Sequence, residues 1–198
     1  MTKIKSKFGY LLLADISGFS SYLVGVELEH AGGVLQKLLE GVAGQIEPVF
    51  NVQGFDIDSV FAYVPEEGMN RFEYLYKLIE STYNGFKSNL LVISDQITCT
   101  CAACRNVTSL DLKFIVHYGE YILASVKEKE LLIGSDPTFV RNRNWKESVA
   151  ASVGWRGYVL FTETCLAHLH LPIDEFQGEE FEYDQIRMFG SELKSEGS

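Results

Sequence analysis

Residues 10–20 read YLLLADISGFS, and this stretch decides how the rest of the chain is arranged. Its first half, Tyr10 to Ala14, is apolar on both faces, which is typical of a central strand covered by helices. The strand runs straight into Asp15 and a polar turn that contains Gly18. Backbone N–H groups at such a turn, together with a helix N-terminus, favour anions and the metal ions that accompany them. Asp15 is therefore the first candidate functional residue.

Helix-type and strand-type spacing alternate along the rest of the chain. Apolar residues three or four positions apart predict amphipathic helices, and short apolar or alternating runs predict strands. This order predicts an α/β (α+β) sandwich with a mixed central sheet, in which the first strand lies near the centre. The expected helices cover residues 34–49 and 72–90 and begin again after Asp136-Pro137, and the expected strands cover 60–64, 110–117, 121–126 and 158–161, with Gly119-Glu120 as a hairpin turn.

Composition limits the class of protein. The chain has 198 residues and a net charge of −10, which predicts one domain over residues 1–198 whose surface repels nucleic acid. We expect its core at about 8–165 and an acidic C-terminal arm at about 172–198. Its apolar runs are far shorter than the ~20 residues of a membrane helix, so we expect no membrane contact and a cytoplasmic location.

Asp58 is the second candidate residue, because it comes directly before the apolar strand at 60–64. A hairpin beside the first strand would bring Asp15 and Asp58 together. Two carboxylates at one place hold Mg²⁺, typically with substrate phosphates completing its coordination. The same spacing suits Asp15 as a helix cap and Asp58 as the end of a turn. The residues alone leave both interpretations open.

Four stretches resemble motifs of the class III nucleotidyl cyclases. Residues 13–20 look like the first metal-binding motif of that family, usually Phe-Ala-Asp-Ile-x-Gly-Phe-Thr. Residues 58–62 resemble the second motif, with Ile57 where glycine is usual. Residues 114–119, FIVHYG, are similar to the Ile-x-x-His-x-Gly strand and turn, and residues 134–138 stand where the family has Gly-x-x-Val-Asn.

The resemblance implies a ferredoxin-like class III cyclase fold with Mg²⁺ or Mn²⁺ as cofactor. The two metal ions would be held by Asp15, Asp58 and the Ile16 carbonyl. In that family the site forms between two subunits, which implies a head-to-tail homodimer or a heterodimer with a complementary cyclase-like domain. The reaction is attack of the ribose 3′-hydroxyl on the α-phosphate with loss of pyrophosphate. The triphosphate of the nucleotide would lie over the backbone of Ser17, Gly18, Phe19 and Ser20.

The chain departs from the family on the side that the partner subunit supplies. That side usually reads the base with a Lys and an Asp and orients the ribose with an Asn and an Arg. Arg141 and Arg143 each lie one residue out of register with that arginine. Glu120, where some cyclases have a phosphate-binding Arg, would repel a triphosphate by about 1–4 kcal/mol at close range. The family's Lys and Asp positions fall here on Gly54 and near Leu131, and its Asn and Arg positions fall on Thr138 and Asn142.

These departures leave three interpretations of the activity open. Loss of one preorganised donor typically lowers the rate ~10²–10³-fold, so we expect a cyclase-like domain that is degenerate as a homodimer and keeps a Mg²⁺–nucleoside triphosphate site. A second hypothesis is the metal-carrying half of a heterodimeric adenylate or guanylate cyclase. A third is an active homodimer whose donors have moved to other positions.

Cys99, Cys101 and Cys104 form a separate cluster. Tetrahedral zinc sites use cysteines at such short spacings, so these three thiolates can bind zinc together with Cys165, His117 or a partner's residue. This predicts a non-enzymatic sensor or interaction module with a zinc or redox loop. Reduced cytosolic thiols are the alternative. The cluster and residues 110–119, LDLKFIVHYG, also resemble an uncharacterised bacterial family of cyclase-like proteins that has these cysteines ahead of a Leu-x-Leu-Lys-Phe-x-x-His-x-Gly strand.

Overall fold

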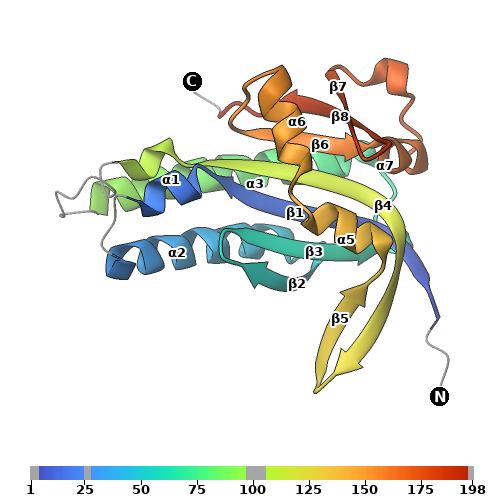
Figure 1. Ribbon diagram of the computed structural model, residues 1–198, viewed down its shortest axis with the longest axis horizontal. Helices are drawn as coiled ribbons and strands as arrows, with labels where there is room; N and C mark the ends of the chain where they lie inside the picture. Colours follow the sequence, from blue (N-terminus) through green and yellow to red (C-terminus); the bar gives the residue numbers. More distant parts are fainter. Residues whose placement is uncertain (1–4, 25–27, 97–105, 196–198) are drawn as a thin grey trace.

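The fold is known from a computed structural model, which describes residues 5–24, 28–96 and 106–195. Within these residues one mixed sheet is covered by helices on both faces (Figure 1). The strands are β1 Lys7–Ser17, β2 Asn51–Asp56, β3 Ser59–Pro65, β4 Asp111–Val126, β5 Lys129–Ile133, β6 Tyr158–Thr162, β7 Glu179–Tyr183 and β8 Ile186–Glu192. The helices are α1 Phe19–Leu23, α2 Leu28–Ile46, α3 Phe72–Gln96, α5 Ser135–Arg141, α6 Trp145–Ser152 and α7 Glu163–His168, with short 3₁₀ turns at Glu66–Gly68, Val107–Ser109 and Ile173–Glu175.

The first strand lies inside the sheet, as its apolar sequence predicts. The strand order is β2-β3-β1-β4-β6-β8-β7, and β5 pairs with β4 off this path. The β4–β6 pair is parallel and the other pairs are antiparallel. The predicted α/β sandwich with a mixed central sheet is therefore confirmed.

Two apolar cores explain why β1 is hydrophobic on both faces. Tyr10 and Leu12 pack on the side of α2 and α3, whereas Leu11 and Leu13 pack on the side of α5 and α6. Alternate side chains of a strand point to opposite faces, so a strand between two helical layers needs apolar residues at every position. Among the described helices, none combines the length and the apolar character that a membrane span requires.

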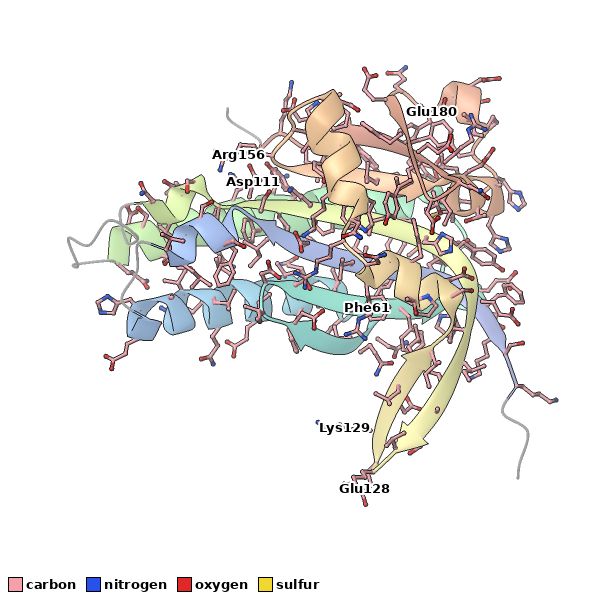
Figure 2. All side chains as sticks on the ribbon, viewed as in Figure 1. Phe61, Asp111, Glu128, Lys129, Arg156 and Glu180 are labelled. Carbon is pink, nitrogen blue, oxygen red and sulfur yellow. The ribbon has the colours of Figure 1, made fainter. Side chains whose placement is uncertain are left out.

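The expected hairpin turn at Gly119-Glu120 is wrong. Strand β4 continues through these residues to Val126, and its hairpin partner is β5. The turn lies at Lys127 and Glu128, both of which have positive φ, as two-residue hairpin turns require. Gly119 instead allows close packing, because a Cβ there would collide with the Asp136 carboxylate. The β4–β5 hairpin projects from the body of the molecule, with Glu128 and Lys129 at its tip (Figure 2).

The acidic C-terminal segment belongs to the sheet. Strands β7 and β8 form a hairpin, and β8 pairs with β6. Phe181 and Met188 are buried in the core on the side of α6, so the apolar core extends beyond residue 165. Arg187 forms ion pairs with Glu163 and Glu180 at 2.8 and 2.7 Å, which offset part of the negative charge of this segment.

Candidate functional site

The C-terminal end of β1 meets the β2–β3 turn at one corner of the sheet. Asp15 lies opposite Ser59 in the β1–β3 register, and the Ile16 amide donates a hydrogen bond to the Asp58 carbonyl at 2.8 Å. The pairing of β1 with β3 therefore places Asp15, Ile16 and Asp58 together. That these residues bind a metal ion stays a prediction.

Two cationic side chains of the same chain contact these carboxylates. Arg143 pairs with Asp58 and lies 3.5 Å from Asp15 Oδ1. Its second guanidinium nitrogen lies 3.3 Å from Asp56 Oδ2 and donates to Ser59 Oγ at 2.8 Å. Lys146 pairs with the other carboxylate oxygen of Asp15. Both cations come from the segment at the end of α5 and the start of α6, which crosses the face of the sheet (Figure 1).

Asp15 is the most deeply buried carboxylate of this corner. Its side chain is 1% exposed, against 16% for that of Asp58 and 41% for that of Asp56. Burial raises the pKa of Asp15 even though Lys146 and Arg143 favour its ionised form. Ionised Asp15 therefore depends on the positive charges beside it, because a buried carboxylate without a partner is costly.

The donor set suits Mg²⁺, but its present arrangement does not fit an additional divalent ion. Carboxylate and backbone carbonyl oxygens are the ligands that Mg²⁺ prefers, and Asp15, Asp58 and Ile16 supply them. Arg143 and Lys146, however, already bring two positive charges against these oxygens. In the described part of the chain, no group of three or more His, Cys, Asp or Glu side chains is placed to hold a metal ion.

The predicted phosphate segment forms a tight turn into α1. Gly18 has a φ of 83°, which a residue with a side chain rarely adopts. The Phe19 side chain is buried and packs on Tyr22, with ring centroids 6.1 Å apart. The Arg156 side chain donates to the Ser109 carbonyl next to this turn, and Figure 2 shows Arg156 near Asp111 at the start of β4. Contacts of Ser17, Gly18, Phe19 and Ser20 with phosphates stay a prediction.

Two residues, at or near which the resemblance places the family's base-reading positions, line one pocket of this chain. Gly54 on β2 and Leu131 on β5 border a cavity of about 180 Å³. Arg141 lies 3.7 Å from Asp56 and 5.4 Å from the ring centroid of Phe61, the β3 residue labelled in Figure 2. The rest of the pocket is lined by Gln53, Phe55, Asp56, Phe61, Leu132 and Arg141.

Thr138 and Asn142, on which the resemblance places the family's ribose-orienting positions, form hydrogen bonds at the two ends of α5. Thr138 Oγ1 donates to the Gly134 carbonyl at 2.7 Å, within its own helix. The Asn142 amide donates to carbonyls in the last turn of α5. The Glu120 amide donates to Asp136 at 2.6 Å. None of these three described contacts reaches the carboxylate corner.

His117 is a buried link between three elements. Its Nδ1 lies 3.0 Å from Thr162 Oγ1 on β6, and its Nε2 lies 3.5 Å from Asp136 Oδ1 on α5. The contact with His117 lowers the pKa of Asp136; burial opposes this effect and the hydrogen bond from the Glu120 amide supports it. The sequence analysis does not predict Asp136 as the partner of His117.

The described residues give the zinc interpretation no support. Cys99, Cys101 and Cys104 lie outside the described residues. Cys165 is fully buried, and burial raises the pKa of its thiol, whereas zinc binds the thiolate. His117 is engaged with Thr162, as described above.

Sequence reasoning also missed the two cations at the carboxylates. The sequence analysis relates Arg143 only to the family's arginine position, from which it lies one residue out of register. Lys146 was not considered. The available sequence signal is local: Arg143 and Lys146 lie three residues apart on either side of Trp145. This spacing does not indicate which carboxylates the two side chains contact.

Comparison with known proteins identifies a family and a fold. A family profile described as "Protein of unknown function (DUF2652)" matches residues 35–152. No curated protein matches the chain. Among solved structures, the guanylyl cyclase Cya2 aligns with 98% of this chain and 96% of its own, at 12% identity and a TM-score of 0.66.

Two further structures share the fold. The catalytic core of a rhodopsin-guanylyl cyclase with converted specificity, in complex with ATPαS, is 11% identical over 97% of this chain and 99% of its own, with a TM-score of 0.60. A bacterial light-regulated adenylyl cyclase is 14% identical over 85% of this chain and 47% of its own, with a TM-score of 0.61. The chain thus spans about half the length of the light-regulated cyclases it matches. At these identities the similarity establishes the nucleotidyl cyclase fold.

The link between His117 and Asp136 predicts a pH-dependent contribution to stability. The native pKa of Asp136 lies below its ordinary value, so the ionised carboxylate stabilises the fold above the unfolded pKa and loses this effect as the pH falls through the native pKa. The difference in unfolding free energy between wild type and Asp136→Asn should be largest at neutral pH and shrink in acid. Urea unfolding across this pH range measures it.

Asp95→Asn is the matched control, because it removes the same charge from an exposed position on α3. A difference between wild type and Asp136→Asn that stays constant as the pH falls would contradict this role for Asp136.

Proposed function

The chain belongs to the family described as "Protein of unknown function (DUF2652)" and has the nucleotidyl cyclase fold, and we propose that it is a cyclase-like domain that is degenerate as a homodimer. The proposal concerns the reaction: such a domain does not convert a nucleoside triphosphate to a cyclic nucleotide by itself. Its nucleotide site would instead serve binding, or pairing with a complementary domain.

The observation that carries this proposal is the use of the partner-side positions. The Thr138 hydroxyl donates a hydrogen bond at the start of its own helix, and Gly54 and Leu131 have no charged side chain that would contact a base. Cyclisation needs preorganised donors where charge develops on the phosphates, and each missing donor typically costs ~10²–10³ in rate. Two copies of this chain would both lack these donors.

A nucleoside triphosphate remains the ligand class to test. The rhodopsin-guanylyl cyclase core with the same fold was solved with ATPαS. In this chain the corner formed by Asp15, Ile16 and Asp58 would face the phosphates, and Mg²⁺ or Mn²⁺ would join them only by displacing Arg143 and Lys146. The pocket of about 180 Å³ between β2 and β5 would receive an apolar or aromatic group, since Phe55, Phe61 and Leu131 border it.

An exposed apolar surface supports a second copy or a related domain as partner. Ile57 is 73% exposed and Ile133 is 46% exposed, and they accompany exposed Phe55 and Leu131. Gln53 of β2 donates to the Glu130 carbonyl of β5, so the two hairpins are joined. Contiguous exposed apolar side chains mark protein-interaction surfaces, and Phe55 and Leu131 border the same pocket. We propose that this surface forms the head-to-tail contact.

The metal-carrying half of a heterodimeric cyclase is the second candidate function. The proximity of Asp15 and Asp58 favours it, because these are the groups that such a half would contribute. Under this alternative, cyclic nucleotide would form only when a complementary cyclase-like domain supplies the base-reading and ribose-orienting residues.

We predict that the full chain, incubated with ATP or GTP and Mn²⁺, forms no 3′,5′-cyclic nucleotide above the level of Asp58→Asn. The reason is the absence of transition-state donors, which neither protein possesses. Chromatography of the reaction products measures this directly. Cyclic product made by the wild type and abolished by Asp58→Asn would contradict the proposal. Product that appears only after addition of a complementary domain would favour the second candidate.

We predict that Ile133→Asp converts the dimer to a monomer in sedimentation equilibrium. A charge at this exposed apolar position would have to be buried on association, which is costly without a partner. Leu91→Asp is the control, because Leu91 is 62% exposed on α3, away from the two hairpins. Equal effects of the two substitutions, or a wild type that sediments as a monomer, would refute this interface.

A further inference from the structure

Two cationic side chains of this chain contact the carboxylates at the end of β1. Arg143 touches Asp15, Asp56 and Asp58, and Lys146 touches Asp15. We propose that Arg143 and Lys146 are internal counter-cations that replace a metal ion and keep the carboxylates closed to Mg²⁺ and Mn²⁺ as long as both side chains stay in contact with them. This inference rests on the proposed function, since both concern the same carboxylates.

Electrostatics makes the two occupants mutually exclusive. The Asp15 side chain is almost fully buried, so its charge requires a cation in direct contact. Arg143 and Lys146 together supply two positive charges, the charge of one divalent ion. A metal ion added beside them would face like charges at contact distance, where repulsion is strong in a poorly solvated site. Metal binding at Asp15 therefore requires both side chains to leave.

Buried apolar residues fix the position of the two cations. Trp145, which lies between them in the sequence, is fully buried, and its Nε1 donates to the Val140 carbonyl at 3.3 Å. Val140 and Val149 are also fully buried in the same core. The cations thus extend from an anchored segment, unlike long side chains on an open surface, whose ion pairs contribute little.

The contact leaves part of Asp15 unsatisfied. Within the described residues, its Oδ1 accepts no hydrogen bond, and Arg143 Nη1 remains 3.5 Å away. Buried polar atoms without a hydrogen bond are uncommon and costly. A competing ligand at this oxygen would regain that interaction, so the closed arrangement is stable but open to exchange.

The test is the affinity of the full chain for Mn²⁺, measured from the electron paramagnetic resonance signal of the unbound ion. The probe variant combines Arg143→Gln with Lys146→Gln, which removes both cations but keeps polar side chains of moderate size. We expect its affinity for Mn²⁺ to exceed that of the wild type at least about tenfold, because two like charges are removed from a dication's site. Addition of Asp58→Asn to the double variant should abolish the gain.

Arg141→Gln is the matched control. Arg141 is a half-exposed arginine of the same segment that lies 3.7 Å from Asp56 but does not contact Asp15 in the described structure. It removes a positive charge from the neighbourhood without opening the carboxylates, so Mn²⁺ affinity should stay close to that of the wild type. A gain for Arg141→Gln equal to that of the double variant would overturn the inference, because it would reflect net charge alone.

Loss of both cations leaves Asp15 uncompensated and can unfold the protein. Thermal unfolding of each variant is therefore followed with and without Mn²⁺. The inference predicts that Mn²⁺ raises the melting temperature of the double variant, or restores its near-ultraviolet circular dichroism, more than it does for the wild type. The single variant Lys146→Gln, which keeps Arg143, should show a smaller gain. Equal Mn²⁺ effects on wild type and double variant would overturn the inference.

Failure of this inference is distinct from failure of the proposed function. A wild type that binds Mn²⁺ as tightly as the double variant overturns the internal counter-cations, whatever its activity. Cyclic product from the wild type overturns the degenerate homodimer, whatever its metal affinity. The Mn²⁺ affinity is measured from the resonance of the free ion without nucleotide, and the cyclase activity is measured from the reaction products.

Discussion

The buried charge of Asp15 is the constraint on which the rest of this corner depends. Asp15 lies near the C-terminal end of β1, a strand that lies between two apolar cores, and its side chain is nearly inaccessible to solvent. Placing an isolated carboxylate there costs several kcal/mol, so the fold must deliver a positive charge to it. Arg143 and Lys146 meet this need from an element distant in sequence, and Trp145 anchors them. The position of the α5–α6 segment is thus coupled to the charge state of β1.

The same constraint relates the fold to its function. Asp15 at the end of β1 and Asp58 on the adjacent turn lie together and supply oxygen ligands of the kind that a magnesium ion prefers. Arg143 and Lys146 neutralise them, while the partner-side positions carry Gly54, Leu131 and Thr138. Both features support the proposed degenerate homodimer: the chain's own cations compensate the carboxylates, and Gly54, Leu131 and Thr138 differ from the preorganised donors that cyclisation requires. The net charge of −10 therefore says little about this corner, where the charges are locally balanced.

The sequence predicts the fold well where a pattern is local. The uninterrupted apolar run at 10–14 predicts a strand buried on both faces, and the motif order over the chain predicts the cyclase-like sheet. The β4–β5 turn was misplaced because Gly119 resembles a turn residue but serves close packing against Asp136, whereas the turn uses Lys127 and Glu128 in unfavourable backbone conformations. The contacts of Arg143 and Lys146 depend on how α5 and α6 cross the sheet, and no spacing in the sequence encodes that approach.

The most direct measurement is a crystal structure of the wild-type chain grown with Mn²⁺, with data collected for the anomalous signal of manganese. The account predicts no anomalous peak between Asp15 and Asp58, with the Arg143 guanidinium against both carboxylates and Lys146 on Asp15. A manganese peak within coordination distance of both carboxylates, with Arg143 and Lys146 turned away, would contradict the claim that the chain's own cations replace the metal ion.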